Sequence, residues 1–212
     1  MCGIAGFLNS HSTIAPSEAA EISAAMNRNL QHRGPDDDGV WMDPEAGISL
    51  VHRRLSIVDL SPAGHQPMVS ADGRYVITYN GEVYSFSEIR KDLEGRGVAL
   101  RGGSDTEVIL EAIGQYGLDA TLARMIGMFA IALWDRRERT LTLFRDRLGI
   151  KPLYWAKFGG LFLFGSELKA LRAHPGWTPR IDSSAVASCA TTTFQRRTGF
   201  TKAFISSSPA PY

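Results

Sequence analysis

The sequence is poor in cysteine, in net charge and in long apolar runs, and each shortage excludes a class of protein. Cys2 and Cys189 are the only cysteines, which excludes a disulfide framework and a four-cysteine zinc site. Lysine and arginine number 23 against 22 acidic residues, so no basic field favours nucleic acid or a membrane surface as a partner. The longest apolar run, residues 128–134, is far shorter than the about 20 residues of a membrane-spanning helix. No secretion signal opens the chain, so we expect a cytoplasmic protein with reduced thiols.

The chain of 212 residues has the composition of an ordinary globular protein, with 44% hydrophobic and 21% charged residues. Short apolar segments predict strands over residues 1–8, 39–42, 48–52, 54–60, 74–79, 129–135, 140–145, 152–157 and 161–164. Apolar residues at helical spacing predict helices over residues 16–30, 86–93, 105–116 and 167–172, with capping boxes at Ser85 and Ser104. Strands in hairpins and helices in blocks predict an α+β fold, with antiparallel sheet covered by helices.

Cys2 is the most informative single residue. If the initiator methionine is removed, which a small second residue permits, the chain begins with a thiol beside a free α-amine. An α-amine ordinarily has a pKa of about 7.7–8.0 and a cysteine thiol one of about 8.5, so together they supply a nucleophile and its base near neutral pH. The alternative is a small buried hydrophobic residue, because free cysteines are commonly buried.

The dipeptide Asn80-Gly81 has two interpretations. It is the commonest sequence of a type I′ hairpin turn, and taken alone it favours a turn. Its functional interpretation is an oxyanion hole, in which an asparagine amide and a glycine backbone N–H donate to one developing oxyanion.

Asp105 and Arg54 are the charged candidates. Asp105 falls in the first turn of a predicted helix, where a carboxylate complements the helix dipole or holds a substrate ammonium. Arg54 is either a solvated strand end or a bidentate clamp for a carboxylate. Residues 101–106 lack the lysine and spacing of a phosphate-binding loop, and the five histidines lack metal-ligand spacing, so we expect no metal.

Together these residues match one substrate, glutamine. Arg54 suits its α-carboxylate and Asp105 its α-ammonium, while Cys2 with Asn80-Gly81 suits its side-chain amide. That set is the one needed to hydrolyse a carboxamide through a thioester.

Longer segments resemble the N-terminal glutaminase domain of glutamine-hydrolysing asparagine synthetases, which are class II amidotransferases. They include Met-Cys-Gly-Ile-Ala-Gly-Phe (1–7), His-Arg-Gly-Pro-Asp-Asp-Asp-Gly (32–39), Arg-Leu-Ser-Ile-Val-Asp (54–59), Tyr-Asn-Gly-Glu (79–82), Ser-Asp-Thr-Glu-Val-Ile-Leu (104–110) and Gly-Ile-Lys-Pro-Leu-Tyr (149–154). The resemblance extends in one order from residue 1 to about 187. Ser85 and Ile131 depart from it, where the family usually has Asn and Phe.

The resemblance implies a four-layer αββα sandwich of two antiparallel sheets, the N-terminal-nucleophile hydrolase fold. It also implies a role for each site residue: Cys2 as nucleophile with its own α-amine as base, Asn80 and Gly81 as oxyanion hole, Arg54 and the backbone of Ile57 and Val58 at the substrate carboxylate, and Glu82 and Asp105 at the ammonium.

In such enzymes the ammonia passes to a C-terminal synthetase domain that activates aspartate with ATP and Mg²⁺. No Ser-Gly-Gly-x-Asp-Ser loop for ATP occurs in this chain, so we expect a glutaminase domain over residues 1–187 with no cofactor of its own. Family members are commonly dimeric, and the resemblance allows a homodimer. Two alternatives stay open: a non-catalytic glutaminase-like module, and the glutaminase half of an amidotransferase with another acceptor. A self-processing hydrolase is disfavoured, because Cys2 directly follows Met1.

Residues 188–212 differ in character from the rest and give no sustained period. With permitted synonymous codons, the same bases read one frame over can encode Tyr-Val-Pro-Ala-Pro and Lys-Leu-Glu-Pro-Gly, both typical of the family. We therefore expect that an inserted or deleted base near codons 187–189 produced an aberrant, poorly ordered tail.

Overall fold

The computed structural model describes residues 1–10, 14–56, 62–178 and 201–206. Its strands are β1 (Gly3–Asn9), β2 (Asp37–Asp43), β3 (Ile48–Arg54), β4 (Met68–Val69), β5 (Tyr75–Val83), β6 (Gly127–Asp135), β7 (Thr140–Arg145), β8 (Tyr154–Phe158), β9 (Leu161–Gly165) and β10 (Thr201–Ser206). Its α-helices are α1 (Pro16–Arg28), α2 (Phe86–Gly95), α3 (Asp105–Tyr116), α4 (Leu118–Arg124) and α5 (Leu168–Arg172), and short 3₁₀ turns span Gln31–Arg33 and Pro62–Gly64.

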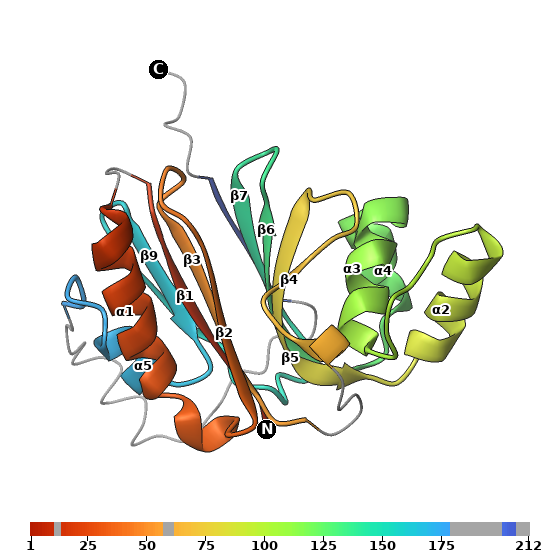
Figure 1. Cartoon of the computed structure of the whole chain (residues 1–212), viewed down its shortest axis with the longest axis horizontal. Helices are drawn as coiled ribbons and strands as arrows, with labels where there is room; N and C mark the ends of the chain where they lie inside the picture. The colour runs from red at the N-terminus through yellow and green to blue at the C-terminus, as the bar shows by residue number, and fades with distance from the viewer. Residues whose placement is uncertain (11–13, 57–61, 179–200, 207–212) are drawn as a thin grey trace, which may run out of the picture.

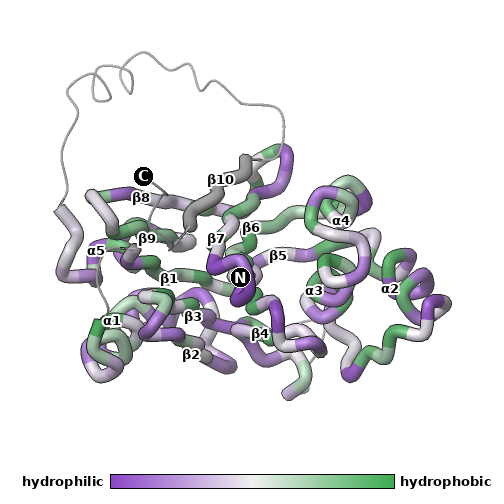
Figure 2. The backbone as a smooth tube through the Cα atoms, turned by 90° about the horizontal axis from the view of Figure 1, so that it is seen from above, coloured by the Kyte–Doolittle hydropathy of each residue, from purple (hydrophilic) through white to green (hydrophobic). Residues whose placement is uncertain are grey.

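The strands form two antiparallel sheets that face each other. One has the order β2-β3-β1-β9-β8, and the other has the order β10-β7-β6-β5-β4. Helices α1 and α5 cover the outer face of the first sheet, and α3 covers the second, with α2 and α4 packed against α3 (Figure 1). The view from above shows the same order of layers (Figure 2). The structure confirms the α+β prediction and the four-layer sandwich.

Apolar side chains fill each space between the layers, because every sheet face is covered by another layer. The space between the two sheets holds Leu8, Ala46, Ile48, Leu50, Val76, Ala132, Trp134, Leu141, Leu143, Phe162 and Phe164. The outer spaces are filled by clusters under α1 and α5 and under α2, α3 and α4. Among the described residues, no helix has the length and apolar character needed to span a bilayer.

The first residues of the chain lie where the two sheets meet. Strand β1 is central in its sheet and pairs with β3, with Gly3 opposite Arg53. Cys2 therefore precedes β1 at the point where β3 ends at Arg54. Both ribbon views place the N-terminus between the sheets (Figures 1 and 2).

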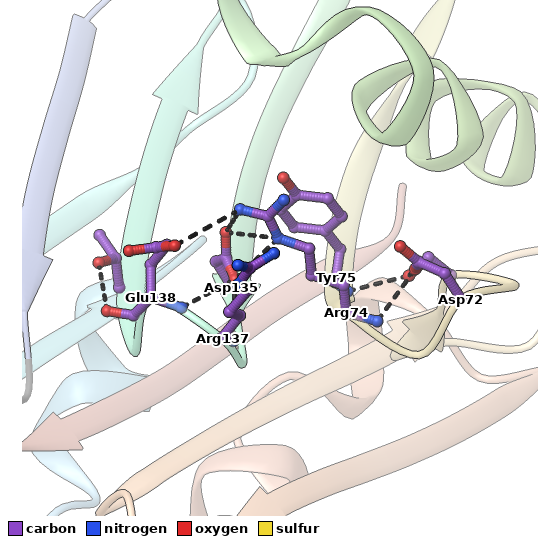
Figure 3. Close-up of polar contacts among 8 residues, drawn as sticks. Asp72, Arg74, Tyr75, Asp135, Arg137 and Glu138 are labelled. Carbon is purple, nitrogen blue, oxygen red and sulfur yellow. Dashed lines mark hydrogen bonds and ion pairs between the residues drawn. The ribbon is translucent and has the colours of Figure 1, made fainter.

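An ion-pair cluster at the start of β5, the end away from Asn80 and Gly81, fixes the register of β5 against β6 (Figure 3). The Arg74 guanidinium lies 2.7 Å from Asp135 Oδ2 and stacks 4.7 Å from the Tyr75 ring centroid. Asp135 also accepts hydrogen bonds from the backbone of Arg137 and Glu138. Burial opposes the ionisation of Asp135, but these hydrogen bonds outweigh it and lower the pKa. The cluster holds the β5–β6 pairing on which the site depends.

Most predicted elements are confirmed, with shifts of one or two residues at their ends, except that β5 continues four residues beyond its predicted end at Tyr79. The Ser104 side chain caps α3 by accepting from the Thr106 N–H, as predicted. The capping box at Ser85 was wrong, because the Ser85 hydroxyl instead donates to the Arg124 carbonyl. Helix α4 was missed, since seven residues are too short to show a helical period. Of the strand predicted over residues 54–60, Arg54 belongs to β3, and residues 57–60 lie outside the described part.

The segment after residue 187 contains a strand where the sequence predicted no regular element. Strand β10 pairs antiparallel with β7, with Thr201 opposite Arg145 and Ser206 opposite Thr140. The free edge of β7 offers unpaired backbone groups, which an extended segment satisfies whatever its sequence period. The domain boundary at residue 187 and the shifted reading frame remain predictions.

Candidate active site

A cavity of about 280 Å³ opens beside the start of β1. It brings together side chains from both sheets and from the start of α3. Its lining consists of Met1, Cys2, Arg54, Leu55, Ser56, Gly64, Gln66, Tyr79, Asn80, Gly81, Glu82, Ser104, Asp105, Thr106, Met128 and Lys151. Six of the eight predicted site residues are among them: Cys2, Arg54, Asn80, Gly81, Glu82 and Asp105. Ile57 and Val58 lie outside the described residues.

Cys2 is half-buried in this cavity, with its sulfur beside backbone polar groups. The backbone N–H of Leu55 donates to the Cys2 Sγ over 3.4 Å, and Sγ lies 3.7 Å from the Leu55 carbonyl. The structure therefore does not support the alternative of a small hydrophobic core residue.

A charged network fixes the backbone of Cys2. Arg33 Nε donates to the Cys2 carbonyl over 2.9 Å, and Arg33 Nη1 lies 3.0 Å from Glu167 Oε1. His32 and Lys169 also contact the Glu167 carboxylate. Partial burial opposes ionisation of Glu167, but hydrogen bonds from these three residues outweigh it and lower its pKa to about 2. Glu167 thus stays ionised and holds Arg33 against the backbone of Cys2.

Asn80 and Gly81 lie inside β5 rather than in a turn, so the hairpin interpretation was wrong. They pair with Ala130 and Phe129 of β6, and the pairing continues on to Val83, so the chain does not turn at Asn80-Gly81. Asn80 is 1% exposed, and its Nδ2 has no hydrogen-bond partner among the described residues. Such an unpaired buried donor costs free energy unless a ligand satisfies it.

Gly81 is required by close packing. A Cβ at this position would lie 2.4 Å from the Met128 carbonyl oxygen and 2.7 Å from the Phe129 Cα. Both are backbone atoms of the neighbouring strand, so neither moves without disturbing the ladder. Glycine therefore permits the strand geometry that brings Asn80 to the cavity.

Arg54 is the last residue of β3 and is only 8% exposed, so the solvated strand end is excluded. Its Nη1 lies 3.9 Å from Asp37 Oδ2, and its Nη2 occupies the space that a side chain at Gly64 would need. Buried and held by neighbours, the guanidinium is a cation with two N–H groups suited to a carboxylate.

Asp105 is the first residue of α3, and its carboxylate is held from β5. Its Oδ2 accepts from the Tyr79 hydroxyl over 2.6 Å and from the Val83 N–H over 3.2 Å. Burial raises the pKa of Asp105, although these hydrogen bonds act in the opposite direction. Exposed Glu82 lines the same cavity and adds a second negative charge. Two carboxylates in one cavity suit a substrate ammonium.

Sequence reasoning assigned no role to Gln66 or Lys151, although both lie in the lining. The Gln66 side chain accepts from the Tyr79 N–H over 2.7 Å and donates to the Thr106 hydroxyl over 3.1 Å, which joins β5 to α3. Lys151 lies in residues 149–154, one of the segments that resemble the family, but a sequence motif does not by itself indicate what the lysine in it does. Among the described residues, no group of three His, Cys, Asp or Glu side chains could hold a metal ion.

Two facing antiparallel sheets between helical layers, with a cysteine at the start of a central strand, define the N-terminal-nucleophile hydrolase fold. The chain belongs to the glutamine amidotransferase domain family, whose model matches residues 1–207. This match includes β10, beyond the boundary that the sequence predicted.

Several similar proteins are glutamine-hydrolysing asparagine synthetases. The chain is 38% identical to asparagine synthetase 3 of Bacillus subtilis, over 88% of this chain and 30% of that protein. It is 39% identical to asparagine synthetase 1 of the same organism, over 81% of this chain and 26% of that protein. The chain thus spans less than a third of the length of these relatives.

Solved structures confirm the fold at lower identity. The glutamine phosphoribosylpyrophosphate amidotransferase of Bacillus subtilis, complexed with ADP and GMP, superposes with a TM-score of 0.65 and 19% identity. The match covers 81% of this chain and 43% of that one. At this identity the likeness establishes the fold alone.

Proposed function

We propose that this chain hydrolyses L-glutamine to glutamate and ammonia through a thioester on Cys2. The observation that carries the proposal is the Nδ2 of buried Asn80, which has no partner in the part of the chain that the structure describes and lines the same cavity as Cys2. A donor held without an acceptor beside a nucleophile is the arrangement of an oxyanion hole. Membership of the glutamine amidotransferase family supports glutamine as the substrate.

The reaction requires removal of Met1, which frees the α-amine of Cys2. The α-amine accepts the thiol proton as Sγ attacks the side-chain amide carbon of glutamine. Asn80 Nδ2 and the Gly81 N–H donate to the oxyanion. The protonated α-amine then gives its proton to the amide nitrogen of the substrate, the C–N bond breaks, and ammonia leaves. Water attacks the thioester, which releases glutamate and restores the thiol.

The rest of the cavity holds the α-carbon end of the substrate. Arg54 binds the α-carboxylate together with the backbone of Ile57 and Val58, and Asp105 and Glu82 bind the α-ammonium. Buried Arg54 and half-buried Asp105 support these assignments, because charge pairs are stronger away from water. No cofactor takes part in this half of the reaction.

The relatives suggest the destination of the ammonia. We propose that the chain is the ammonia-supplying half of an ATP-dependent asparagine synthetase, whose synthetase domain, with ATP and Mg²⁺, lies in cis. A homodimer of such a protein is part of this proposal.

Release of glutamate and ammonia from L-glutamine tests the proposal. We expect release by the protein lacking Met1 and no release by Cys2→Ala, which still binds glutamine. A folded protein that binds glutamine but releases nothing would instead support a non-catalytic binding module.

A further inference from the structure

Lys151 is a buried cation in the cavity that has no charged partner among the described residues. Its side chain is 7% exposed and lines the cavity. Among the described residues, the contact of its ammonium is with the Met1 sulfur, at 3.8 Å, and no carboxylate lies within ion-pairing distance. Removal of Met1 would take away that contact and leave the ammonium facing the cavity.

The loop before Lys151 is built to hold it there. The buried Asp146 carboxylate accepts from the backbone N–H groups of Phe129, Ile150 and Lys151, over 3.2, 2.9 and 3.0 Å. Because Phe129 is the ladder partner of Gly81, this carboxylate ties Lys151 to the strand pair that carries the oxyanion hole. The contact with Met1, the residue before Cys2, shows that the ammonium lies on the side of Cys2. Lys151 therefore belongs to the nucleophile end of the cavity.

A buried ammonium costs free energy unless an anion compensates it. Arg54 is the proposed partner of the substrate α-carboxylate. An anion that pairs with Lys151 must therefore come from the side-chain end of the ligand. Glutamine is neutral there, but hydrolysis converts its amide to a carboxylate. We propose that Lys151 binds the γ-carboxylate of the product glutamate, which makes it a product-binding residue of this site. This inference rests on the proposed glutaminase function.

Glutamine and glutamate share the same α-groups and differ only at this end. Loss of the Lys151 charge must therefore weaken the binding of glutamate more than the binding of glutamine. If Lys151 had a purely structural role, its replacement would weaken the binding of both ligands equally, because both bind in the same cavity. The comparison of the two ligands separates these roles.

Calorimetric titration of L-glutamate and L-glutamine into the Cys2→Ala protein, with Met1 removal checked by intact mass, tests the inference. We expect Lys151→Met to weaken glutamate by roughly 10- to 100-fold, the range of a charge-assisted hydrogen bond, and glutamine by less than about twofold. Lys151→Arg should retain most of the glutamate affinity. The matched control is Lys91→Met, which removes an exposed lysine on α2 and should change neither affinity.

Equal losses for both ligands in Lys151→Met, or unchanged glutamate affinity, would overturn the role of Lys151 while leaving the glutaminase proposal intact. Absence of binding of either amino acid to the parent protein would instead overturn the proposed function, and this inference with it.

Discussion

The Tyr79 hydroxyl donates a hydrogen bond of 2.6 Å to Asp105 Oδ2, which joins β5 to the first turn of α3 inside the cavity. Burial and the Asp105 charge raise the pKa of Tyr79 well above its ordinary value, so the hydroxyl keeps its proton and remains a donor. The bond lowers the pKa of Asp105 against the effect of burial. Tyr79 is thus a positioning residue for the carboxylate that we assign to the substrate ammonium.

Tyr79→Phe should raise the KM for glutamine by about tenfold, the worth of one hydrogen bond to a charged group, with little change in kcat. Loss of the donor raises the pKa of Asp105 further, so the carboxylate is protonated at higher pH. The defect should therefore be larger at pH 6 than at pH 8 in steady-state assays. Tyr116→Phe is the matched control, because its hydroxyl donates to Asp92 on the helical layer instead. A KM independent of pH in Tyr79→Phe would contradict this role.

Asn80→Ala should reduce kcat by roughly 10²- to 10³-fold, the usual cost of removing one oxyanion-hole donor. The KM for glutamine should change little, because the donor acts on charge that develops during the reaction. Since Asn80 Nδ2 has no partner among the described residues, thermal unfolding should shift by only a few degrees. A kcat within threefold of the parent would remove Asn80 from the oxyanion hole.

Gly81→Ala should lower the melting temperature and abolish most activity, because the added Cβ meets backbone atoms of β6 at 2.4 and 2.7 Å. Gly114→Ala provides the control. A Cβ at Gly114 has no heavy atom within 4 Å, and alanine in α3 should stabilise the protein by about 0.5–1 kcal/mol. Calorimetric scanning of both variants compares the two glycines, and equal melting temperatures would show that the close approach at Gly81 is tolerated.

Glu167→Gln tests the network behind Cys2 through its pH dependence. The pKa of Glu167 is lowered from 4.5 to about 2 in the folded chain, so its contribution to stability is complete above about pH 4.5. That contribution falls as the pH decreases towards 2. Urea unfolding should therefore show the parent more stable than Glu167→Gln at pH 7, with the difference shrinking from pH 4.5 downwards. A difference that stays constant over this range would mean that the carboxylate is not stabilised by its charge.

Much of the fold could be predicted from the sequence because local patterns agree with it. Alternating apolar runs and short turns fix the hairpin of β6 with β7 and that of β8 with β9. Ser104 predicts the start of α3, because serine is a preferred residue at a helix N-cap. In contrast, β10 depends on the free edge of β7, which is a long-range relationship that no local period reveals.

The site was predictable in its residue types but not in its geometry. Cys2 and Asn80 carry recognisable chemistry, yet a local reading of Asn80-Gly81 favours a turn, and only the β5–β6 register places it mid-strand. The Tyr79–Asp105 hydrogen bond and the Lys151–Met1 contact join residues that are distant in sequence. Such contacts arise from tertiary packing, which spacing does not encode.

Capture of the thioester on Cys2 is the most direct test of the central claim. The protein is mixed with L-glutamine, quenched in acid within its turnover time, digested and examined by mass spectrometry. We predict that the N-terminal peptide begins at Cys2 and carries one glutamyl group in a linkage cleaved by hydroxylamine, and that Cys2→Ala carries none. An unmodified Cys2 peptide during active turnover, or a glutamyl group on another residue, would contradict the assignment of Cys2 as the nucleophile.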